Sequence, residues 1–161
     1  MIYILMGVSG SGKTTIGKKL AGKLQLPFYD ADDFHPKSNI KKMESAIPLD
    51  DRDRKPWLEL LAEKMLTWEN NGGAVLACSA LKESYRKLLD QNPEVHVRFI
   101  YLKGSKELIA DRIRNRDSHF MPEKLLQSQF DALEEPENAI VINIDTDPDE
   151  LADRIVSYYS K

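Results

Sequence analysis

Residues 7–14 read Gly-Val-Ser-Gly-Ser-Gly-Lys-Thr and match the pattern G-x-x-x-x-G-K-[ST] at every fixed position. An apolar run precedes this stretch and a helical periodicity follows it, which is the context that a phosphate-binding loop requires. Glycines let the backbone curl so that successive N–H groups point at phosphate oxygens, and the following helix adds the positive end of its dipole. Lys13 is expected to reach the β- and γ-phosphates of ATP, and Thr14 to ligate Mg²⁺. The alternative, a chance match in a Gly/Ser-rich turn, does not explain the placement between a strand and a helix.

Working outward from this loop, apolar runs alternate with amphipathic stretches along the whole chain. The predicted strands are mostly unbroken apolar runs, as expected of strands covered on both faces, and they span 2–6, 27–29, 74–78, 95–102 and 140–144. Apolar residues recur at helical spacing within 16–24, 57–68, 81–88, 105–113, 122–133 and 147–155. Ser105 and Asp147 are suited to cap two of these helices, and Trp57, Trp68 and Cys78 are expected in the core. The alternation predicts an α/β domain with a parallel sheet flanked by helices.

Length and composition limit the possible functions. The 161 residues fit a single domain, 1–161, and 42% hydrophobic with 30% charged residues is typical of a folded protein. The net charge of −3 argues against nucleic acid as the main partner. No apolar stretch approaches the roughly 20 residues of a membrane helix, and the N-terminal run lacks the basic flank of a signal peptide. Cys78 is the single cysteine, so no intrachain disulfide forms, and we expect a cytoplasmic protein without a membrane partner.

Two polar stretches, 31–54 and 116–122, interrupt the alternation of strands and helices. In an α/β domain such excursions are where binding loops and lids occur. The first of them offers only Ile40 and Met43 as candidates for the core. The alternative is that both stretches are ordinary surface loops.

The loop at 7–14 does not by itself decide the class of nucleotide-binding protein. A GTPase should carry N-K-x-D and D-x-x-G, and neither pattern is present. A motor ATPase should have a mid-chain strand that ends in Asp, whereas this one ends in Cys78-Ser79-Ala80. Asp145 does follow an apolar run, but that run is the last predicted strand, and we interpret Asp145 as a strand-end residue. The remaining class is that of the small kinases.

Two carboxylates follow the second predicted strand and are candidates for the chemistry. Asp30 and Asp32 lie two residues apart, so an extended backbone turns both side chains the same way, at the end of the sheet where ligands bind. One could hold a water molecule of the Mg²⁺ shell, and the other could accept the proton of an attacking hydroxyl. Asp33 adds a third carboxylate of uncertain aim. The alternative is a solvated acidic turn.

Two basic pairs at helical i, i+4 spacing are candidates for binding anions. Arg112 and Arg116 stand just before Asp117-Ser118-His119-Phe120, and forked guanidinium groups there match the charge on a transferring phosphoryl group. The alternative is a salt-bridged surface face. Lys82 and Arg86 follow the third strand and could meet a substrate carboxylate. Arg98, inside an apolar run, is expected at an edge or an interface.

Over essentially its whole length the chain resembles the gluconokinase family, which is related to the shikimate kinase and nucleoside monophosphate kinase group of phosphate-loop folds. The runs that carry the resemblance are more specific than the phosphate loop, and they stand here as Asp30-x-Asp32, His35-Pro36-x-x-Asn39, Lys42-Met43, Pro48-Leu49-x-Asp51-x-Asp53-Arg54-x-Pro56-Trp57-Leu58, Cys78-Ser79-Ala80-Leu81-Lys82, Tyr85-Arg86, His119-Phe120 and Gln129-Phe130. Ala46 and Ser118 depart from the family pattern, since glycine is common at both positions.

The resemblance implies a fold and a reaction. The fold is a five-stranded parallel sheet of order 2-3-1-4-5, with a substrate-binding segment near 31–65 and a lid near 116–126. The reaction is the ATP-dependent phosphorylation of D-gluconate at O6, with Mg²⁺, by an enzyme that is often a homodimer. Two alternatives stay open: a kinase of another small acceptor, such as a shikimate-like acid or a nucleoside monophosphate, and a nucleotide-binding regulator without turnover.

The resemblance also implies roles for individual residues. Asp32 would deprotonate the substrate hydroxyl, and Lys13 and Arg116 would be the other catalytic residues. Thr14 would ligate Mg²⁺, and Asp30 would contact the ion through a water molecule. The residues implied to contact ATP are Gly7, Ser9, Gly10, Ser11, Gly12, Lys13, Thr14, Thr15, Arg112 and Arg116. The residues implied to contact gluconate are Asp32, His35, Arg54, Lys82, Arg86, His119 and Gln129.

Overall fold

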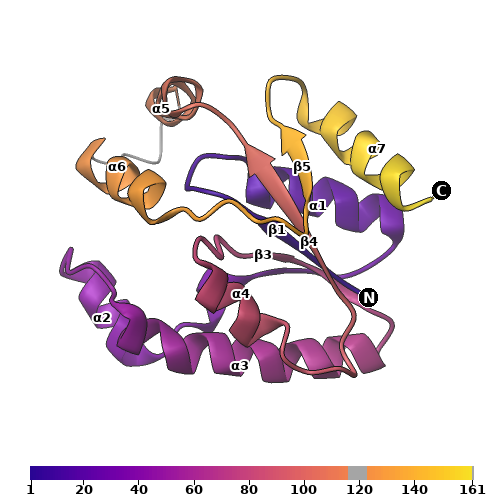
Figure 1. The fold of residues 1–161 in the computed structure, drawn as a ribbon, viewed down its shortest axis with the longest axis horizontal. Coiled ribbons are helices and arrows are strands. Elements are labelled where there is room, and N and C mark those ends of the chain that lie inside the picture. Colours follow the sequence, from indigo (N-terminus) through magenta and orange to yellow (C-terminus); the bar gives the residue numbers. More distant parts are fainter. Residues whose placement is uncertain (116–122, 161) are drawn as a thin grey trace.

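A five-stranded parallel sheet forms the centre of the computed structural model, which describes residues 1–115 and 123–160 (Figure 1). The strands are β1 (Ile2–Met6), β2 (Phe28–Asp30), β3 (Ala74–Ala77), β4 (Val97–Lys103) and β5 (Ile140–Asn143). Their order is β2-β3-β1-β4-β5 and every neighbouring pair is parallel, which confirms the predicted order. Each predicted strand is present, with bounds that differ by at most two residues.

Helices cover both faces of the sheet, so each face has its own apolar core. Alternate residues of β1 point to opposite faces: Ile4 packs with α3 (Asp51–Asn70), α4 (Glu83–Leu89) and the short 3₁₀ helix η1 (Ala31–Phe34). Leu5 packs on the other face with α1 (Lys13–Leu24), α5 (Lys106–Arg114), α6 (Glu123–Ala132) and α7 (Pro148–Tyr159). Trp57, Trp68 and Cys78 are buried as predicted. Within the described ranges, none of the helices has the length and apolarity that crossing a membrane requires.

Side-chain caps fix where several helices begin. The hydroxyl of Ser105 accepts from the Leu108 N–H at the start of α5, and the Asp147 carboxylate accepts from the Asp149 N–H at the start of α7. Both predicted caps are therefore confirmed. α3 begins at Asp51, earlier than its apolar stripe predicted, because Asp50 and Asp53 form a reciprocal capping box.

The polar stretch 31–54 is more ordered than its composition predicted. It contains η1, the eight-residue α2 (Lys37–Glu44) and the first turn of α3, so the alternative of an ordinary surface loop is wrong. The expectation that Ile40 and Met43 contribute to the core is also wrong, because these side chains are 41% and 44% exposed. Most of the predicted lid, including Arg116, Ser118 and His119, lies outside the described residues.

The backbone at Ala46 is strained, which gives a physical reason for the glycine that the resemblance leads one to expect there. Ala46 follows α2 with a φ of 57°, in the left-handed region, where a Cβ atom is crowded by the backbone. The N–H of Ala46 donates to the Met43 carbonyl and the N–H of Ile47 to the Lys42 carbonyl, which closes the end of the helix. These hydrogen bonds at the end of α2 therefore hold Ala46 in the left-handed conformation, and an alanine adopts that conformation only with steric strain.

We expect Ala46→Gly to raise the free energy of unfolding by about 0.5–1 kcal/mol, because the relief of left-handed strain exceeds the added entropy of the unfolded chain. Urea denaturation followed by circular dichroism measures this difference. Ala62→Gly, inside α3, is the matched control and should lower stability by about 0.5–1 kcal/mol. A lower stability for Ala46→Gly would contradict this account of the helix end.

Candidate active site

The phosphate loop leaves the carboxyl end of β1 and runs directly into α1. Gly10 and Gly12 adopt φ values of 83° and 97°, and Gly12 is the residue that precedes the first turn of α1. A Cβ atom at Gly10 would lie 2.8 Å from the side chain of Ile113 on α5, so glycine is needed there for space as well as for conformation. The loop therefore has the curled backbone and the helix N-terminus that the sequence predicted for a triphosphate.

Polar groups of the right chemistry surround this loop. The Lys13 ammonium group lies over it and donates to the carbonyls of Gly7 and Val8, at 3.0 Å each. The Thr14 hydroxyl donates to the Asp30 carboxylate, 3.3 Å away. A hydroxyl and a carboxylate beside a phosphate cradle are the hard oxygen donors that Mg²⁺ takes when most of its shell is water and phosphate. In residues 1–115 and 123–160 no cluster of three metal-ligating side chains occurs, so the fit depends on this arrangement.

The two candidate carboxylates lie at the carboxyl end of β2, as predicted, and their surroundings differ. Asp30 ends the strand and accepts from the Asp32 N–H at 3.0 Å, which caps η1 and aims its other oxygen at Thr14. Asp32 is exposed, and its carboxylate lies 3.6 Å from Nε2 of His35. The pKa of Asp32 is below its ordinary value, first because of His35 and also because of Lys13. Asp32 is therefore held as a carboxylate next to the phosphate loop.

Arg54 and Lys82, both predicted to contact the substrate, are brought together by Asp51 and Tyr85, to which no role was assigned from the sequence. The Tyr85 hydroxyl donates to Asp51 at 2.5 Å and accepts from Arg54 at 3.1 Å. Lys82 lies 3.4 Å from the same carboxylate and 5.6 Å from the centre of the Tyr85 ring. Burial raises the pKa of Tyr85, and the hydrogen bond from this hydroxyl lowers that of Asp51. Asp51 and Tyr85 both lie in the sequence runs that resemble the gluconokinase family, and this was the signal from which a role for them could have been predicted.

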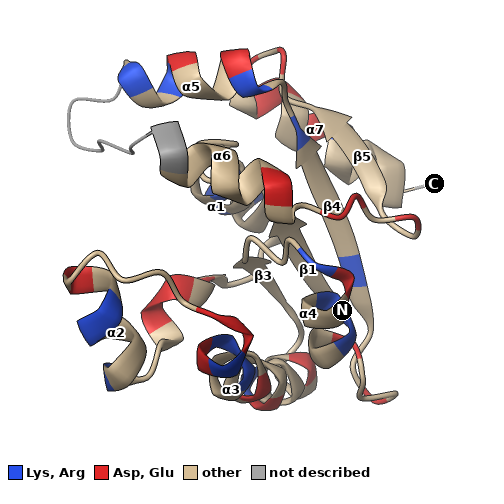
Figure 2. Cartoon of the chain, turned by 60° about the vertical axis from the view of Figure 1, so that its left-hand side comes forward, with Lys and Arg blue, Asp and Glu red and all other residues tan. Residues whose placement is uncertain are grey.

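The site has four parts. The phosphate loop follows β1, Asp32 follows β2, Lys82 follows β3, and Arg54 lies in the first turn of α3. Figure 2 shows basic and acidic residues interspersed along α2 and α3, on the side of the sheet that carries Arg54. A triphosphate cradle, a carboxylate and a pair of cations thus share one edge of the sheet. This arrangement can hold a nucleotide and a small anionic acceptor side by side.

Comparison with known proteins identifies the family. The shikimate kinase family profile matches residues 9–159. A thermosensitive gluconokinase of Escherichia coli is 49% identical over 136 residues, covering 84% of this chain and 72% of that protein. A probable gluconokinase of Dictyostelium discoideum is 43% identical over 171 residues, covering 98% and 86%. This chain belongs to the gluconokinase family.

The structural comparison agrees. A crystal structure of a gluconokinase from Sinorhizobium meliloti superimposes with a TM-score of 0.84 at 36% identity, over 98% of this chain and 94% of that one. The fold is therefore that of a gluconokinase. The family assignment does not by itself test the role of each residue, so the remaining predicted site residues are located below.

Arg86, predicted to contact substrate, is buried at 7% exposure and its guanidinium is surrounded by carbonyl oxygens. It donates to Ala80 at 2.7 Å, to Leu81 at 3.2 Å and to Glu134 at 2.8 Å. Burial lowers the pKa of Arg86. These contacts join the loop after β3 to the segment after α6, so the visible role of Arg86 is to fix the loop that carries Lys82.

Gln129 was predicted to contact gluconate and Arg112 to contact ATP, and the structure gives the contacts of both. Gln129 on α6 accepts from the Ser9 N–H at 2.7 Å and donates to the Ser9 hydroxyl at 3.0 Å, so it contacts the phosphate loop. Arg112 on α5 donates to the carbonyl of Ile144. Thr15 is exposed in the first turn of α1. Arg116 and His119 lie outside the described residues.

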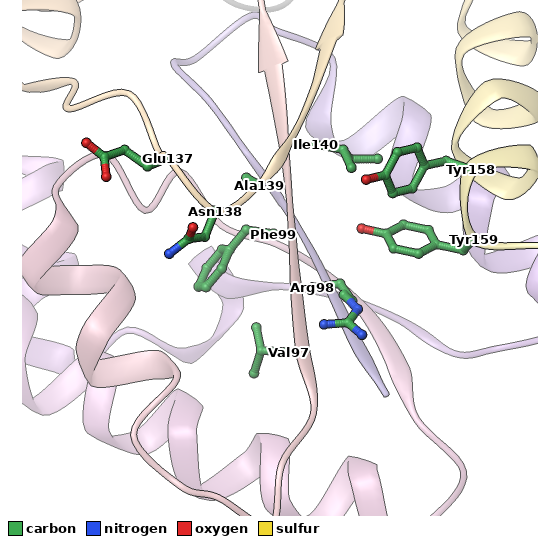
Figure 3. Close-up of a pocket in the computed structure, with 9 residues that line it drawn as sticks. All are labelled: Val97, Arg98, Phe99, Glu137, Asn138, Ala139, Ile140, Tyr158 and Tyr159. Carbon is green, nitrogen blue, oxygen red and sulfur yellow. The ribbon is translucent and has the colours of Figure 1, made fainter. Parts of the chain in front are cut away.

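A cavity of about 470 Å³ lies away from this site, at the amino ends of β4 and β5 (Figure 3). Arg98, Tyr158 and Tyr159 line it together with Asn138. Because the strands are parallel, this end of the sheet is opposite the phosphate loop. The cavity is therefore separate from the candidate active site.

We expect Arg86→Met to lower the free energy of unfolding by about 2–3 kcal/mol, because buried carbonyl oxygens lose their donors. Chemical denaturation measures this, and Arg52→Met, at an exposed position of α3, is the control that should change little. Unchanged stability with a raised KM for the acceptor would instead make Arg86 a substrate ligand.

Proposed function

We propose that this protein transfers the γ-phosphoryl group of ATP to O6 of D-gluconate, giving 6-phospho-D-gluconate and ADP. The observation that carries the proposal is the position of Asp32. It is an exposed carboxylate on η1, and the positive charge of Lys13 in the phosphate loop helps to lower its pKa. The family membership supports the choice of acceptor, because the relatives that match this chain closely are gluconokinases.

The residues on the nucleotide side would bind and neutralise the triphosphate. Backbone N–H groups of 7–14 would surround the phosphate oxygens, and Lys13 would leave its two carbonyl partners for the β- and γ-phosphates. Thr14 and, through water, Asp30 would hold Mg²⁺, which neutralises charge on the phosphates when bound. Arg116 is proposed to reach the γ-phosphate and Arg112 to lie against the nucleotide.

The residues on the acceptor side would bind a six-carbon monoanion and prepare its hydroxyl. Asp32 would accept the O6 proton as the oxygen attacks phosphorus, since an ionised carboxylate within reach is the base the step requires. Arg54 and Lys82 carry the positive charge that a sugar-acid carboxylate needs, and Tyr85 holds them together. His119 remains a proposal for the hydroxyl groups, and Gln129 would have to release Ser9 before it could contact them.

We also propose that the enzyme acts in the cytoplasm as a homodimer. The buried thiol of Cys78, whose pKa burial raises to about 12, suits a reducing compartment because it is inert there and needs no partner. Dimerisation is proposed from the family resemblance, and sedimentation equilibrium tests it.

A coupled ADP-release assay over gluconate, shikimate, AMP, CMP and adenylylsulfate tests the acceptor. We expect turnover with gluconate alone, because Arg54 and Lys82 offer cations to a sugar-acid carboxylate, while the nearby rings of Trp57 and Tyr85 are buried and do not present a face to a base. Turnover only with a nucleotide or with shikimate would refute the proposal. ATP binding without turnover of any acceptor would favour a regulatory protein.

Asp32→Asn separates catalysis from binding. We expect kcat to fall by about a hundredfold or more, since a general base contributes on that order, while ATP still binds in calorimetric titration. Asp33→Asn is the matched control, an exposed carboxylate on the same 3₁₀ helix, and should retain the rate. Equal rates for the two variants would exclude Asp32 as the base.

A further inference from the structure

Asn39 is a buried amide whose orientation is determined by its neighbours. The residue is 1% exposed, and its Nδ2 atom lies 2.9 Å from the carbonyl oxygen of Asp53 and 3.2 Å from Nδ1 of His35. A carbonyl oxygen only accepts hydrogen bonds, so the Asn39 atom that faces it is the NH₂ group. The group that Asn39 presents to His35 is therefore also a donor.

This donor fixes the tautomer of His35. Because Asn39 donates to Nδ1, that nitrogen carries a lone pair, and the proton of the neutral imidazole resides on Nε2. Nε2 is the atom that faces Asp32, at 3.6 Å from its Oδ1. The gap is slightly longer than a hydrogen bond, and a small rotation of the exposed Asp32 carboxylate closes it.

The imidazole ring itself is held in place by stacking and burial. It stacks on Trp57 with a centroid separation of 4.2 Å and an interplanar angle of 17°. Trp57 is anchored in turn, because its indole N–H donates to the carbonyl of Ala31 at 2.8 Å. The His35 side chain is 4% exposed. A buried, stacked and hydrogen-bonded ring is poorly placed to contact a substrate directly.

We propose that Asn39 and His35 form a chain that orients Asp32, in which the Nε2–H of His35 holds the carboxylate toward the acceptor hydroxyl. His35 is then a positioning residue and not a ligand of gluconate. It does not take the transferred proton, since Nε2 already carries one and Nδ1 accepts from Asn39. The proton stays on Asp32, whose exposed carboxylate returns it to solvent. The proposal rests on the proposed function in one respect, the role of Asp32 as base.

Long-range ¹H–¹⁵N correlation spectroscopy of the nucleotide-free protein at neutral pH tests the chain without any acceptor. The sequence has 3 histidines, and loss of one signal set in His35→Gln identifies His35. We expect His35 to show the pattern of the Nε2–H tautomer, and the preference to weaken in Asn39→Ala and Asn39→Ser. Exposed His96 is the internal reference and should not respond to either change. An Nδ1–H pattern, or no response to the Asn39 variants when circular dichroism shows them folded, would overturn the proposal. Unfolding of both variants leaves the wild-type pattern as the deciding result.

Kinetics with ATP and gluconate distinguish a positioning residue from a ligand. We expect His35→Leu to lower kcat by about ten- to a hundredfold, a fraction of a general base's contribution, with KM for gluconate within about twofold. His35→Gln keeps a side-chain N–H and should recover most of the rate. His96→Leu, at an exposed histidine, should match the wild type.

The contrary result is a raised KM with unchanged kcat in both His35 variants, which would make His35 a ligand of the acceptor. Absence of gluconate turnover in the wild type would refute the proposed function instead. The tautomer of His35 would still be decided by the spectra.

Discussion

The curl of the backbone between β1 and α1 is the constraint on which the site depends. Gly10 and Gly12 allow the curl by adopting positive φ values, and the closeness of Ile113 to Gly10 leaves no room for a larger residue. The sheet order then places the other groups, because β1 lies between β3 and β4 and every strand ends at the same edge. A site at this edge receives side chains from segments far apart in the sequence.

The groups around the loop are held by contacts with one another, which makes the site organised before a ligand arrives. Asp30 caps η1 and receives the Thr14 hydroxyl, so one carboxylate links the acceptor segment to the first turn of α1. The hydroxyl of Tyr85 on α4 bonds to both Arg54 and Asp51 on α3, which links the two helices. Such prearrangement lowers the reorganisation that substrate binding and phosphoryl transfer require.

Local patterns in the sequence predicted the helices and strands. The strand order, the start of α3 and the role of Arg86 depend on contacts that local patterns do not reveal. Short apolar runs, most of them unbroken, predicted every strand, but the order of the strands came only from the family resemblance, because periodicity says nothing of which strands pair. Pro56 and a polar first turn concealed the start of α3, which depends on the reciprocal hydrogen bonds of Asp50 and Asp53. Arg86 could not be recognised as a structural residue from spacing, since its carbonyl partners come from two distant loops.

A crystal structure with gluconate and a non-hydrolysable ATP analogue tests the central claim most directly. The account predicts the triphosphate inside the curl of 7–14 and the Asp32 carboxylate within hydrogen-bond distance of O6, on the side opposite the leaving group. A triphosphate bound elsewhere, or Asp32 turned into solvent in the closed complex, would contradict it.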